Sequence, residues 1–304
     1  MIDVAIIGSG PAGLTAAIYA ARAGLSATVF ESVFLGGQVS KTYEVENYPG
    51  VERMSGMDLM MKIDAQAKEF GAEYKNEEIT EIRPAEGNGY LLVTPSGEEA
   101  ARTVILTTGA KPRLLGVPGE DTFSGRGVSY CATCDGAFYR GKRAAVVGGG
   151  NTALEDAVFL SRYCETVYLI HRRDEFRADK SLQEKAKAAS NIEIRYDTVV
   201  TKLFGGTALE GAILKNVKTG EETELSVNGV FVAVGTVPNS TLLDGVVEKD
   251  PAGYIITDAS MATNLPGVFA AGDARNTPLR QIITAAADGA VAAYSASVYL
   301  AKQK

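Results

Sequence analysis

Two cysteines lie close together in the chain and are the residues best suited to chemistry. Cys131 and Cys134 form the C-x-x-C of YCATCDGAFYR, and Asp135 follows them directly. A pair at this spacing binds a metal ion, forms a disulfide that can be reduced and reoxidised, or serves as two structural buried thiols. A zinc ion would need two more ligands, and the remaining candidates, Cys164 and His171, are expected to have structural places elsewhere.

The residues around the pair favour the redox interpretation. Gly136 and the neighbouring polar residues indicate a turn or a helix start, where the positive end of a helix stabilises a thiolate. The third cysteine, Cys164, follows a predicted helix and precedes a predicted strand, so it is expected to be an inert core residue. The sequence therefore predicts a redox-active disulfide and no metal site.

A glycine pattern near the N-terminus indicates a first dinucleotide site. Gly8, Gly10 and Gly13 form G-x-G-x-x-G around Pro11, directly after an apolar strand and before an Ala-rich helix. In this context the glycines permit a tight turn and bring backbone N–H groups against a pyrophosphate. Eighteen residues after Gly13 the strand ATVF ends at Glu31, whose carboxylate can hold a ribose diol. The alternative is a glycine turn of purely structural use.

A second glycine pattern carries a different specificity signal. Gly148, Gly150 and Ala153 repeat the motif, and the same offset of eighteen residues leads to His171 at the end of the strand VYLI. No acid stands there. Instead, three arginines stand where the 2′-phosphate of NADPH would lie: Arg172, Arg173 and Arg177. Their guanidiniums can pair with that phosphate. This register favours NADPH over NADH, the alternative being a solvated basic run, and His171 is expected to take no part in proton transfer.

Two different dinucleotide sites in one chain imply two cofactors. The first site, with an acid and no arginine cluster, suits FAD, and the second suits NADPH. Hydride would then pass from the nicotinamide to the flavin.

An internal repeat must position these residues. Residues 4–17 resemble residues 144–157, and the strands 104–112 and 230–238 both end in a Gly followed three residues later by Pro. The segment after Pro238 is too short for a third domain and should return to complete the first module. We therefore predict an α/β fold of two similar Rossmann-like, three-layer domains, the NADPH domain inserted into the FAD domain. The FAD domain would span 1–113 and 245–304, the NADPH domain with the disulfide 117–241, and the hinges would lie near 112–117 and 236–246.

Further elements follow from local patterns. Ser55 and Asp58 form a capping box before a helix whose Met57, Met60, Met61 and Phe70 are expected in the core. Residues 90–95 and 199–223 alternate as short antiparallel strands with turns. Residues 282–300 predict a buried Ala-rich helix that is too polar to span a membrane.

Composition excludes several classes of protein. The 304 residues are 46% hydrophobic and 22% charged, which argues against a disordered chain. The net charge of −7 argues against general nucleic-acid binding. Asp3 stands where a signal peptide would need basic residues, so a cytoplasmic protein with no membrane association is expected.

The motifs, taken together, resemble one family over essentially the whole chain. GSGPAG, GGQ (36–38), ENYPG (46–50), CATCDG, GGGNTA, HRRDEFR, GDA (272–274) and LRQI (279–282) occur in this order. The chain thus resembles the low-molecular-weight bacterial thioredoxin reductases. The resemblance implies a homodimeric, NADPH- and FAD-dependent enzyme that reduces thioredoxin or a similar small redox protein. It also implies that the inserted domain rotates about the hinges, presenting either the disulfide or the nicotinamide to the flavin.

The resemblance also assigns roles to single residues. Cys134 would face the isoalloxazine, Cys131 would attack thioredoxin, and Asp135 would supply a proton. Asn151 and Thr152 of GGGNTA would join the NADPH site, together with His171 of HRRDEFR. Flavin contacts would come from Gly37, Gln38, Asn47, Gly109, Asp273, Arg280 and Gln281, with Asp273 at the ribitol. Partner docking would use Arg126 and the loop Ala137, Phe138 and Tyr139. Related enzymes often have a second phenylalanine where Ala137 stands, so the apolar anchor is weaker in this chain.

Four alternative functions fit the sequence less well. A reductase of a peroxide-detoxifying system would carry extra N-terminal thioredoxin-like domains, before what is here the first strand. A ferredoxin-NADP reductase would not need CATC, and a disulfide-forming oxidase has no use for the arginine run. A redox-sensing module that holds FAD only structurally would not turn over NADPH.

Overall fold

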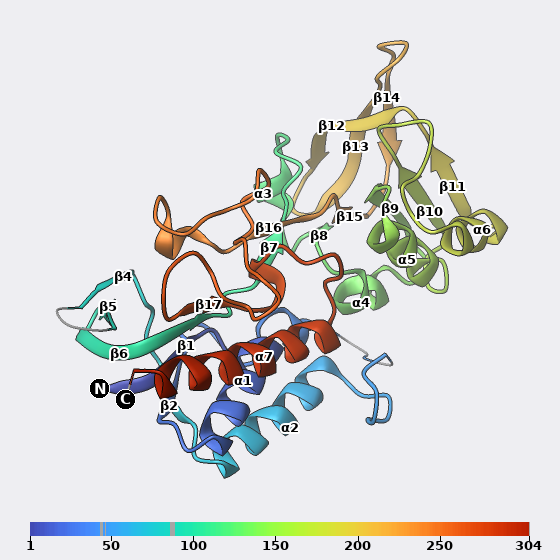
Figure 1. Cartoon of the computed structure of the whole chain (residues 1–304). Helices are drawn as coiled ribbons and strands as arrows, with labels where there is room; N and C mark the ends of the chain where they lie inside the picture. Colours follow the sequence, from blue (N-terminus) through green and yellow to red (C-terminus); the bar gives the residue numbers. More distant parts are fainter. Residues whose placement is uncertain (43–44, 46, 86–88, 304) are drawn as a thin grey trace. The chain divides into compact units, whose positions relative to one another are not determined.

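A computed structural model describes residues 1–42, 45, 47–85 and 89–303, and the side chains of Lys41 and Cys134 lie outside the described part. The chain divides into two compact units (Figure 1). Unit 1 comprises Met1–Lys111 and Val237–Lys304, and unit 2 comprises Pro112–Thr236.

Unit 1 is built on a mixed sheet. Its strands run in the order β3-β2-β1-β6-β5-β4, with β17 also paired to β6. Neighbours among β1, β2, β3, β6 and β17 are parallel, whereas β5 runs antiparallel to both β4 and β6. The strands are β1 (Ile2–Ile7), β2 (Ala27–Phe30), β3 (Glu73–Lys75), β4 (Glu81–Pro84), β5 (Tyr90–Thr94), β6 (Gly97–Leu106) and β17 (Val268–Ala270).

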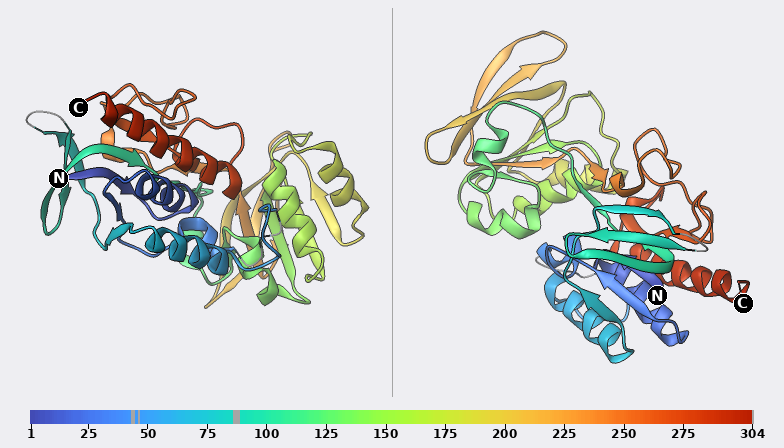
Figure 2. Two further views of the ribbon diagram at one scale, coloured as in Figure 1. Left: turned by 60° about the horizontal axis from the view of Figure 1, so that its bottom comes forward. Right: turned by 90° about the vertical axis from the view of Figure 1, so that its left-hand side faces the viewer.

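Helices cover one face of this sheet because β1 alternates its side chains. Val4 and Ile6 pack with the helices, while Ala5 and Ile7 join a second cluster with the antiparallel strands. Figures 1 and 2 both show the three long helices side by side. They are α1 (Pro11–Arg22), α2 (Gly56–Glu69) and α7 (Ile282–Ala301), and the short 3-10 turns of this unit are η1 (Gly37–Lys41), η3 (Thr241–Leu243) and η4 (Gly272–Ala274).

The start of α2 follows the capping prediction, but its apolar stripe does not. Ser55 Oγ accepts from the Asp58 N–H at 3.0 Å. Met60 is fully buried, whereas Met57, Met61 and Phe70 are exposed at 42%, 56% and 36%, so the core prediction is wrong for these three. At about 100° per residue, positions 57 and 61 lie about 90° and 130° away from the centre of the buried face of α2, so their side chains point to its side and beyond it.

Unit 2 repeats the plan on a parallel sheet in the order β11-β10-β9-β15-β8. Ala144 and Val146 of β9 pack with helices, and Ala145 and Val147 pack with an antiparallel sheet, β12-β13-β14. The helices are α3 (Glu120–Phe123), α4 (Ala132–Asp135), α5 (Asn151–Leu160) and α6 (Lys180–Ala188), with the 3-10 turn η2 (Gly136–Tyr139). The strands are β8 (Val128–Ser129), β9 (Arg143–Gly148), β10 (Thr166–Ile170), β11 (Ile192–Arg195), β12 (Thr198–Gly205), β13 (Leu209–Asn216), β14 (Glu222–Ser226) and β15 (Gly229–Ala233).

The chain passes between the units twice, along β7 (Ala110–Pro112) and β16 (Thr236–Pro238), which pair with each other. The unit boundaries lie between Lys111 and Pro112 and between Thr236 and Val237. Residues 237–244 belong to unit 1, although the sequence assigns part of them to the inserted domain. Asn239 explains the difference, because its backbone N–H bonds to Gly109 O and its side chain to Thr108 O.

The last helix, α7, forms as expected and lies against α1. Alanines bury one face of it, while Ile283, Val291 and Tyr294 are exposed on the other. Within the described residues, no helix combines the length and apolar character needed to cross a bilayer.

Candidate functional site

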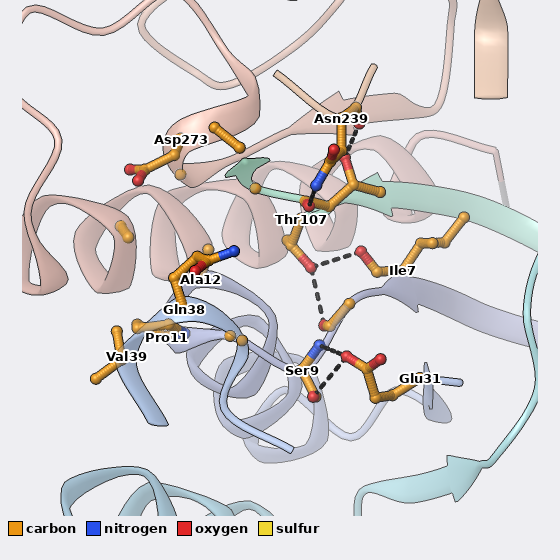
Figure 3. A pocket seen from close by; sticks show the side chains of 18 of the residues that line it. Ile7, Ser9, Pro11, Ala12, Glu31, Gln38, Val39, Thr107, Asn239 and Asp273 are labelled. Atoms are coloured by element: carbon orange, nitrogen blue, oxygen red, sulfur yellow. Dashed lines mark hydrogen bonds between the residues drawn. The ribbon is translucent and has the colours of Figure 1, made fainter. Parts of the chain in front are cut away.

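A deep pocket of about 780 Å³ opens in unit 1 above the carboxyl ends of β1, β2 and β6 (Figure 3). In a parallel α/β sheet this edge is where ligands bind. Of the residues assigned to FAD from the sequence, all but Gly13 line it: Gly8, Gly10, Pro11, Glu31, Gly37, Gln38, Asn47, Gly109, Asp273, Arg280 and Gln281. Glu46 of the ENYPG motif lies outside the described residues.

The three glycines of the first motif serve different purposes. A Cβ on Gly13 would lie 1.9 Å from Gly8 O, and one on Gly8 would lie 2.5 Å from Thr107 O, so both are needed for packing. Gly8 also has a φ of +109°, which favours glycine. Gly10 has an ordinary φ of −72°, and a Cβ there would meet no protein atom within 4 Å. Gly10 therefore keeps the floor of the pocket open at the N-terminus of α1, as a pyrophosphate cradle requires.

Glu31 lies at the end of β2 with its carboxylate held in place. Its Oε2 accepts from Ser9 N at 3.1 Å and Ser9 Oγ at 2.8 Å (Figure 3). Its Oε1 accepts from Val33 N at 3.0 Å. A carboxylate has about four acceptor sites, so one remains for a ribose hydroxyl. The sequence did not single out Ser9, whose position inside the glycine motif is its only signal.

Buried charges line the opposite end of the pocket. Burial raises the pKa of Asp273, the Arg280 guanidinium opposes this rise, and the Asp288 carboxylate adds to it. The Arg280 guanidinium lies 3.9 Å from the Tyr254 ring centroid, and its Nε is buried with no hydrogen-bond partner among the described residues. An unpartnered buried N–H of this kind is costly unless a ligand or water satisfies it.

Two segments far apart in sequence close the middle of the pocket. Thr107 Oγ1 donates to Ile7 O at 2.8 Å or Gly8 O at 2.9 Å, and Thr108 Oγ1 donates to Asn239 O. On the other side, Asn47 Nδ2 donates to Gln281 Oε1 at 3.0 Å. Sequence patterns did not identify Thr107 and Thr108, because VILTTGAKP was interpreted only as a closing strand and turn.

The pocket therefore fits FAD on three observations. The open cradle at Gly10 suits a pyrophosphate, the held carboxylate of Glu31 suits a ribose diol, and the unpartnered Arg280 Nε suits an acceptor on a bound group.

The glycine loop of unit 2 is shaped by a histidine. His171 is 5% exposed, and a Cβ on Gly149 would lie 2.1 Å from its Cε1 atom. Its Nε2 lies 3.0 Å from Glu175 O. Burial lowers the pKa of His171, backbone hydrogen bonds oppose that effect, and the charges of Arg173 and Arg177 add to it. The ring is thus a neutral packing group that supports the loop.

The arginine run lies next to this loop with all three guanidiniums exposed: Arg172, Arg173 and Arg177. The Arg177 N–H bonds to Gly149 O at 2.8 Å, which ties the run to the glycine turn. Lys218, from the β13–β14 turn, pairs with Asp174 at 2.9 Å and Asp197 at 3.0 Å. Lys218 thereby offsets an acid inside the run.

Other residues assigned to this cofactor lie at the start of α5. Gly150 is the N-cap, and a Cβ there would meet no protein atom within 4 Å, as at Gly10. Gly148 is packed against Ala233 O. Thr152 is exposed, and Asn151 exchanges hydrogen bonds of 2.8 and 2.9 Å with Asp179.

The redox pair lies where the chain turns from β8 into the short helix α4. Cys131 is disulfide-bonded and partly buried. Cys134 falls within α4, and its side chain lies outside the described part. Asp135 Oδ2 accepts a hydrogen bond of 2.6 Å from Ser129 Oγ, a residue that sequence patterns did not reveal.

The side chains expected to dock a partner differ in exposure. Phe138 is 73% exposed, and Arg126 is exposed with its Nη2 2.5 Å from Thr122 O. Tyr139 instead packs edge-on against Phe231 at 5.2 Å, because Gly229 leaves room for its ring.

Cys164 is the free, buried thiol that the sequence predicts. It is 6% exposed, and burial raises its pKa to about 11. Its burial agrees with the core position that the sequence predicts, and a thiol so rarely ionised near neutral pH is a weak nucleophile.

Known proteins share this architecture. Residues 2–289 match the family model described as pyridine nucleotide-disulphide oxidoreductase. The thioredoxin reductase of Peptoclostridium acidaminophilum is 46% identical over 98% of this chain and 96% of its own. The bifunctional thioredoxin reductase/thioredoxin of Mycobacterium leprae is 46% identical over 99% of this chain and 66% of its own. The crystal structure of Lactococcus lactis thioredoxin reductase superposes with a TM-score of 0.92 at 41% identity, covering 99% of this chain and 100% of that one.

These findings confirm the resemblance, the α/β fold with two dinucleotide-binding domains, and the prediction of an oxidoreductase that uses FAD and NADPH. The match spans nearly the full chain in sequence and in structure. The chain therefore belongs to the thioredoxin reductases of the pyridine nucleotide-disulphide oxidoreductase family.

Proposed function

We propose that unit 1 holds FAD, that unit 2 holds NADPH and the redox disulfide, and that the chain passes electrons from NADPH to the disulfide of thioredoxin. The observation that carries this proposal is the disulfide at Cys131, in the same unit as the arginine run and beside Asp135. The pocket of unit 1 supports the FAD assignment.

In this proposal the chain's residues bind and orient the first cofactor. Gly8, Gly10 and Pro11 receive the pyrophosphate at the N-terminus of α1, and Glu31 binds the adenosine ribose. The remaining pocket residues hold the ribitol and the flavin ring: Gly37, Gln38, Asn47, Gly109, Asp273, Arg280 and Gln281. Gly13 acts indirectly, by letting α1 approach β1.

Unit 2 binds the second cofactor in the same manner. Gly148 and Gly150 shape the phosphate turn, with Asn151 and Thr152 beside it at the start of α5. The 2′-phosphate is bound by Arg172, Arg173 and Arg177, and His171 supports the glycine turn by packing against Gly149.

FAD, when bound, accepts a hydride from NADPH and passes two electrons on to the disulfide. The protein supplies the groups that follow. Cys134 faces the flavin, Cys131 attacks the partner disulfide, and Asp135 holds the proton that one sulfur needs. The mixed disulfide between Cys131 and the partner is resolved when the Cys134 thiolate attacks the Cys131 sulfur.

Thioredoxin or a similar small redox protein is the proposed substrate, and the relative with a fused thioredoxin supports this choice. Phe138 and Arg126 offer exposed apolar and cationic contacts for docking. Tyr139 contributes only its accessible edge, since its ring packs on Phe231.

We further propose a cytoplasmic homodimer that binds neither nucleic acid nor membranes. Exposed apolar side chains on the outer helices of unit 1 support self-association: Tyr19, Met57, Met61, Ile283, Val291 and Tyr294. Sedimentation at micromolar concentration tests the dimer, and a monomer with unchanged activity would refute it.

Paired serine substitutions test the roles of the two cysteines. Cys134→Ser should trap thioredoxin in a mixed disulfide through Cys131, because no second thiol remains to release it. Cys131→Ser should trap none, and both variants should still bind FAD and oxidise NADPH with an artificial electron acceptor. Cys164→Ser serves as the matched control and should reduce thioredoxin normally. Trapping only in Cys131→Ser would reverse the roles, and full activity in both variants would remove the pair from the mechanism.

A further inference from the structure

The buried hydroxyl of Ser129 hydrogen-bonds to both Cys131 and Asp135. Ser129 is 5% exposed at the end of β8, where its backbone pairs with Phe231 of β15. Its Oγ lies 2.6 Å from Asp135 Oδ2, and it accepts from the Cys131 N–H at 3.1 Å. The Cys131 carbonyl oxygen is a second possible acceptor for it, at 3.3 Å. One side chain thus contacts both the reactive cysteine's backbone and the neighbouring acid.

The Ser129 hydroxyl can hydrogen-bond to Asp135 whether the Asp135 carboxyl is ionised or protonated. A serine has one proton to donate and two lone pairs to accept with. When Asp135 is ionised, the Ser129 proton points to Oδ2, and the short distance is typical of an O–H···O⁻ bond. When Asp135 is protonated, Asp135 donates to Ser129 Oγ, and the Ser129 proton turns to Cys131 O. The Cys131 N–H occupies the other lone pair in both cases.

We propose that Ser129 is the positioning residue for proton transfer at the redox disulfide, an inference that rests on the proposed role of Asp135. Its hydroxyl holds the Asp135 carboxyl in one orientation before and after the proton leaves. Because the same oxygen bonds to Cys131 N, the acid is aligned relative to the cysteine that attacks the partner.

The hydride that NADPH supplies amounts to two electrons and one proton. The two electrons break the S–S bond of Cys131 and leave two thiolates, and the proton of the hydride is released to water. The proton on Asp135 moves to one of them, giving one thiol, one thiolate and an Asp135 carboxylate. The Ser129 proton then turns from Cys131 O to Asp135 Oδ2, and water returns a proton to Asp135 in the next cycle.

The groups that share this environment are few. The charge of Asp135 contributes to the raised pKa of Tyr139, although burial of that phenol is the larger cause, so Tyr139 faces the same region. Thr133 Oγ1 lies 3.3 Å from Cys131 Sγ. Among the described residues, Ser129 is the one whose side chain hydrogen-bonds to the Asp135 carboxylate, and it is therefore the residue to substitute.

The test compares Ser129→Ala with Ser129→Thr in the FAD-loaded enzyme. The alanine variant should lower kcat for thioredoxin about tenfold, because it removes a hydrogen bond to a charged group. KM for thioredoxin should stay unchanged, and the solvent deuterium isotope effect on kcat should rise as proton transfer becomes limiting. Ser129→Thr, which keeps the hydroxyl, should recover most of the activity. Ser161→Ala is the matched control, since its hydroxyl only bonds back to Val158 O in the same unit.

A double-substitution cycle separates positioning from structure. In an Asp135→Asn background, Ser129→Ala should cost little more, since its partner charge is already gone. An equal tenfold loss in both backgrounds would show that the hydroxyl acts only on the Cys131 turn and would overturn the proposal. Full thioredoxin reduction by Asp135→Asn alone would instead refute the proposed role of Asp135. Flavin reduction by NADPH in rapid mixing precedes these steps and should be normal in every variant, which confirms folding.

Discussion

At the scale of single residues, glycines separate packing from ligand binding. Gly13 and Gly10 lie three residues apart, yet only Gly13 is closed off by protein atoms. The same contrast recurs in unit 2, where Gly149 touches His171 and Gly150 faces open space. Substitution by alanine, which adds a methyl group, therefore distinguishes a glycine needed for packing from one that leaves space for a cofactor.

Gly10→Ala and Gly13→Ala should fail in different ways. Gly10→Ala should keep the stability of the FAD-free protein, because its φ is ordinary and its Cβ meets nothing. It should weaken FAD binding, since the methyl group fills the pyrophosphate cradle. Gly13→Ala should lower the free energy of unfolding by about 2 kcal/mol or more, as overpacking does. Thermal unfolding with and without added FAD measures both effects, and equal destabilisation by the two variants would contradict this division.

The partly buried carboxyl of Asp156, on α5, should make stability depend on pH. Burial raises its pKa from an ordinary 3.8 to about 7, with a smaller contribution from Glu155. The native state therefore holds an extra proton between these pH values. The stabilisation that this bound proton gives to the native state is complete below about pH 4 and is lost as the pH rises through 7.

Asp156→Asn should remove this dependence. At pH 8 the variant should be more stable than the parent by about 1 kcal/mol, less than the full pKa shift would give because the group is partly solvated. At pH 4 the two should unfold alike. Urea titrations at both pH values check this, with exposed Glu184→Gln as a control that should change neither. A gain of the same size at pH 4 would point to helix propensity instead.

At the scale of elements, cofactor choice depends on a loop that several elements hold. The arginine run is tied to the glycine turn by Arg177 N–H and to the β13–β14 turn by Lys218. Because these ties already fix the backbone of the run, little further ordering of the backbone would be needed for the proposed binding of a phosphate.

Arg172→Ala should lower kcat/KM for NADPH about tenfold, the loss of one charge-assisted bond in a partly wet site. NADH lacks the 2′-phosphate, so its kcat/KM should stay nearly constant. Lys218→Met is the matched comparison: it frees Asp174 near the run and should reduce NADPH use by no more than about threefold, since exposed ion pairs contribute little. Equal losses with both cofactors would argue against the 2′-phosphate assignment.

Sequence patterns predicted the parts of the site that lie within one strand–turn–helix unit. The glycine motifs, Glu31 and the arginine run depend on short, regular spacings, and Gly8, Gly10 and Glu31 line one pocket in the structure. Asn239 was missed because it reaches Thr108 across 131 residues, and no local period encodes that contact. Ser129 was missed because a hydroxyl at a strand end has no pattern until the turn brings Asp135 back to it. Met57 and Met61 were misassigned because apolar character alone does not say which face of α2 is covered.

At the scale of the whole molecule, one chain carries two centres that each take two electrons. An anaerobic titration with NADPH should therefore reduce both the flavin and the disulfide with about two equivalents per chain. In Cys131→Ser the count should fall to about one, since the disulfide is gone. Absorbance of the flavin and thiol counting follow the two centres separately. One equivalent in the parent protein would mean that the disulfide does not communicate with the flavin.

The double crossing at β7 and β16 also dictates an order of assembly during synthesis. The strand β6 emerges early, but its partner β17 and the covering helix α7 come from Val237–Lys304, after all of unit 2. Unit 2 is continuous, and the Arg113 N–H bonds to Gly235 O across its two ends. Unit 2 can therefore fold before β17 and α7 have been synthesised, whereas the first 111 residues cannot complete unit 1 until then. Chains that end at residue 236 should thus, once released from the ribosome, show a protease-resistant unit 2 and a cleavable N-terminal segment, so the inserted half is the first to become native.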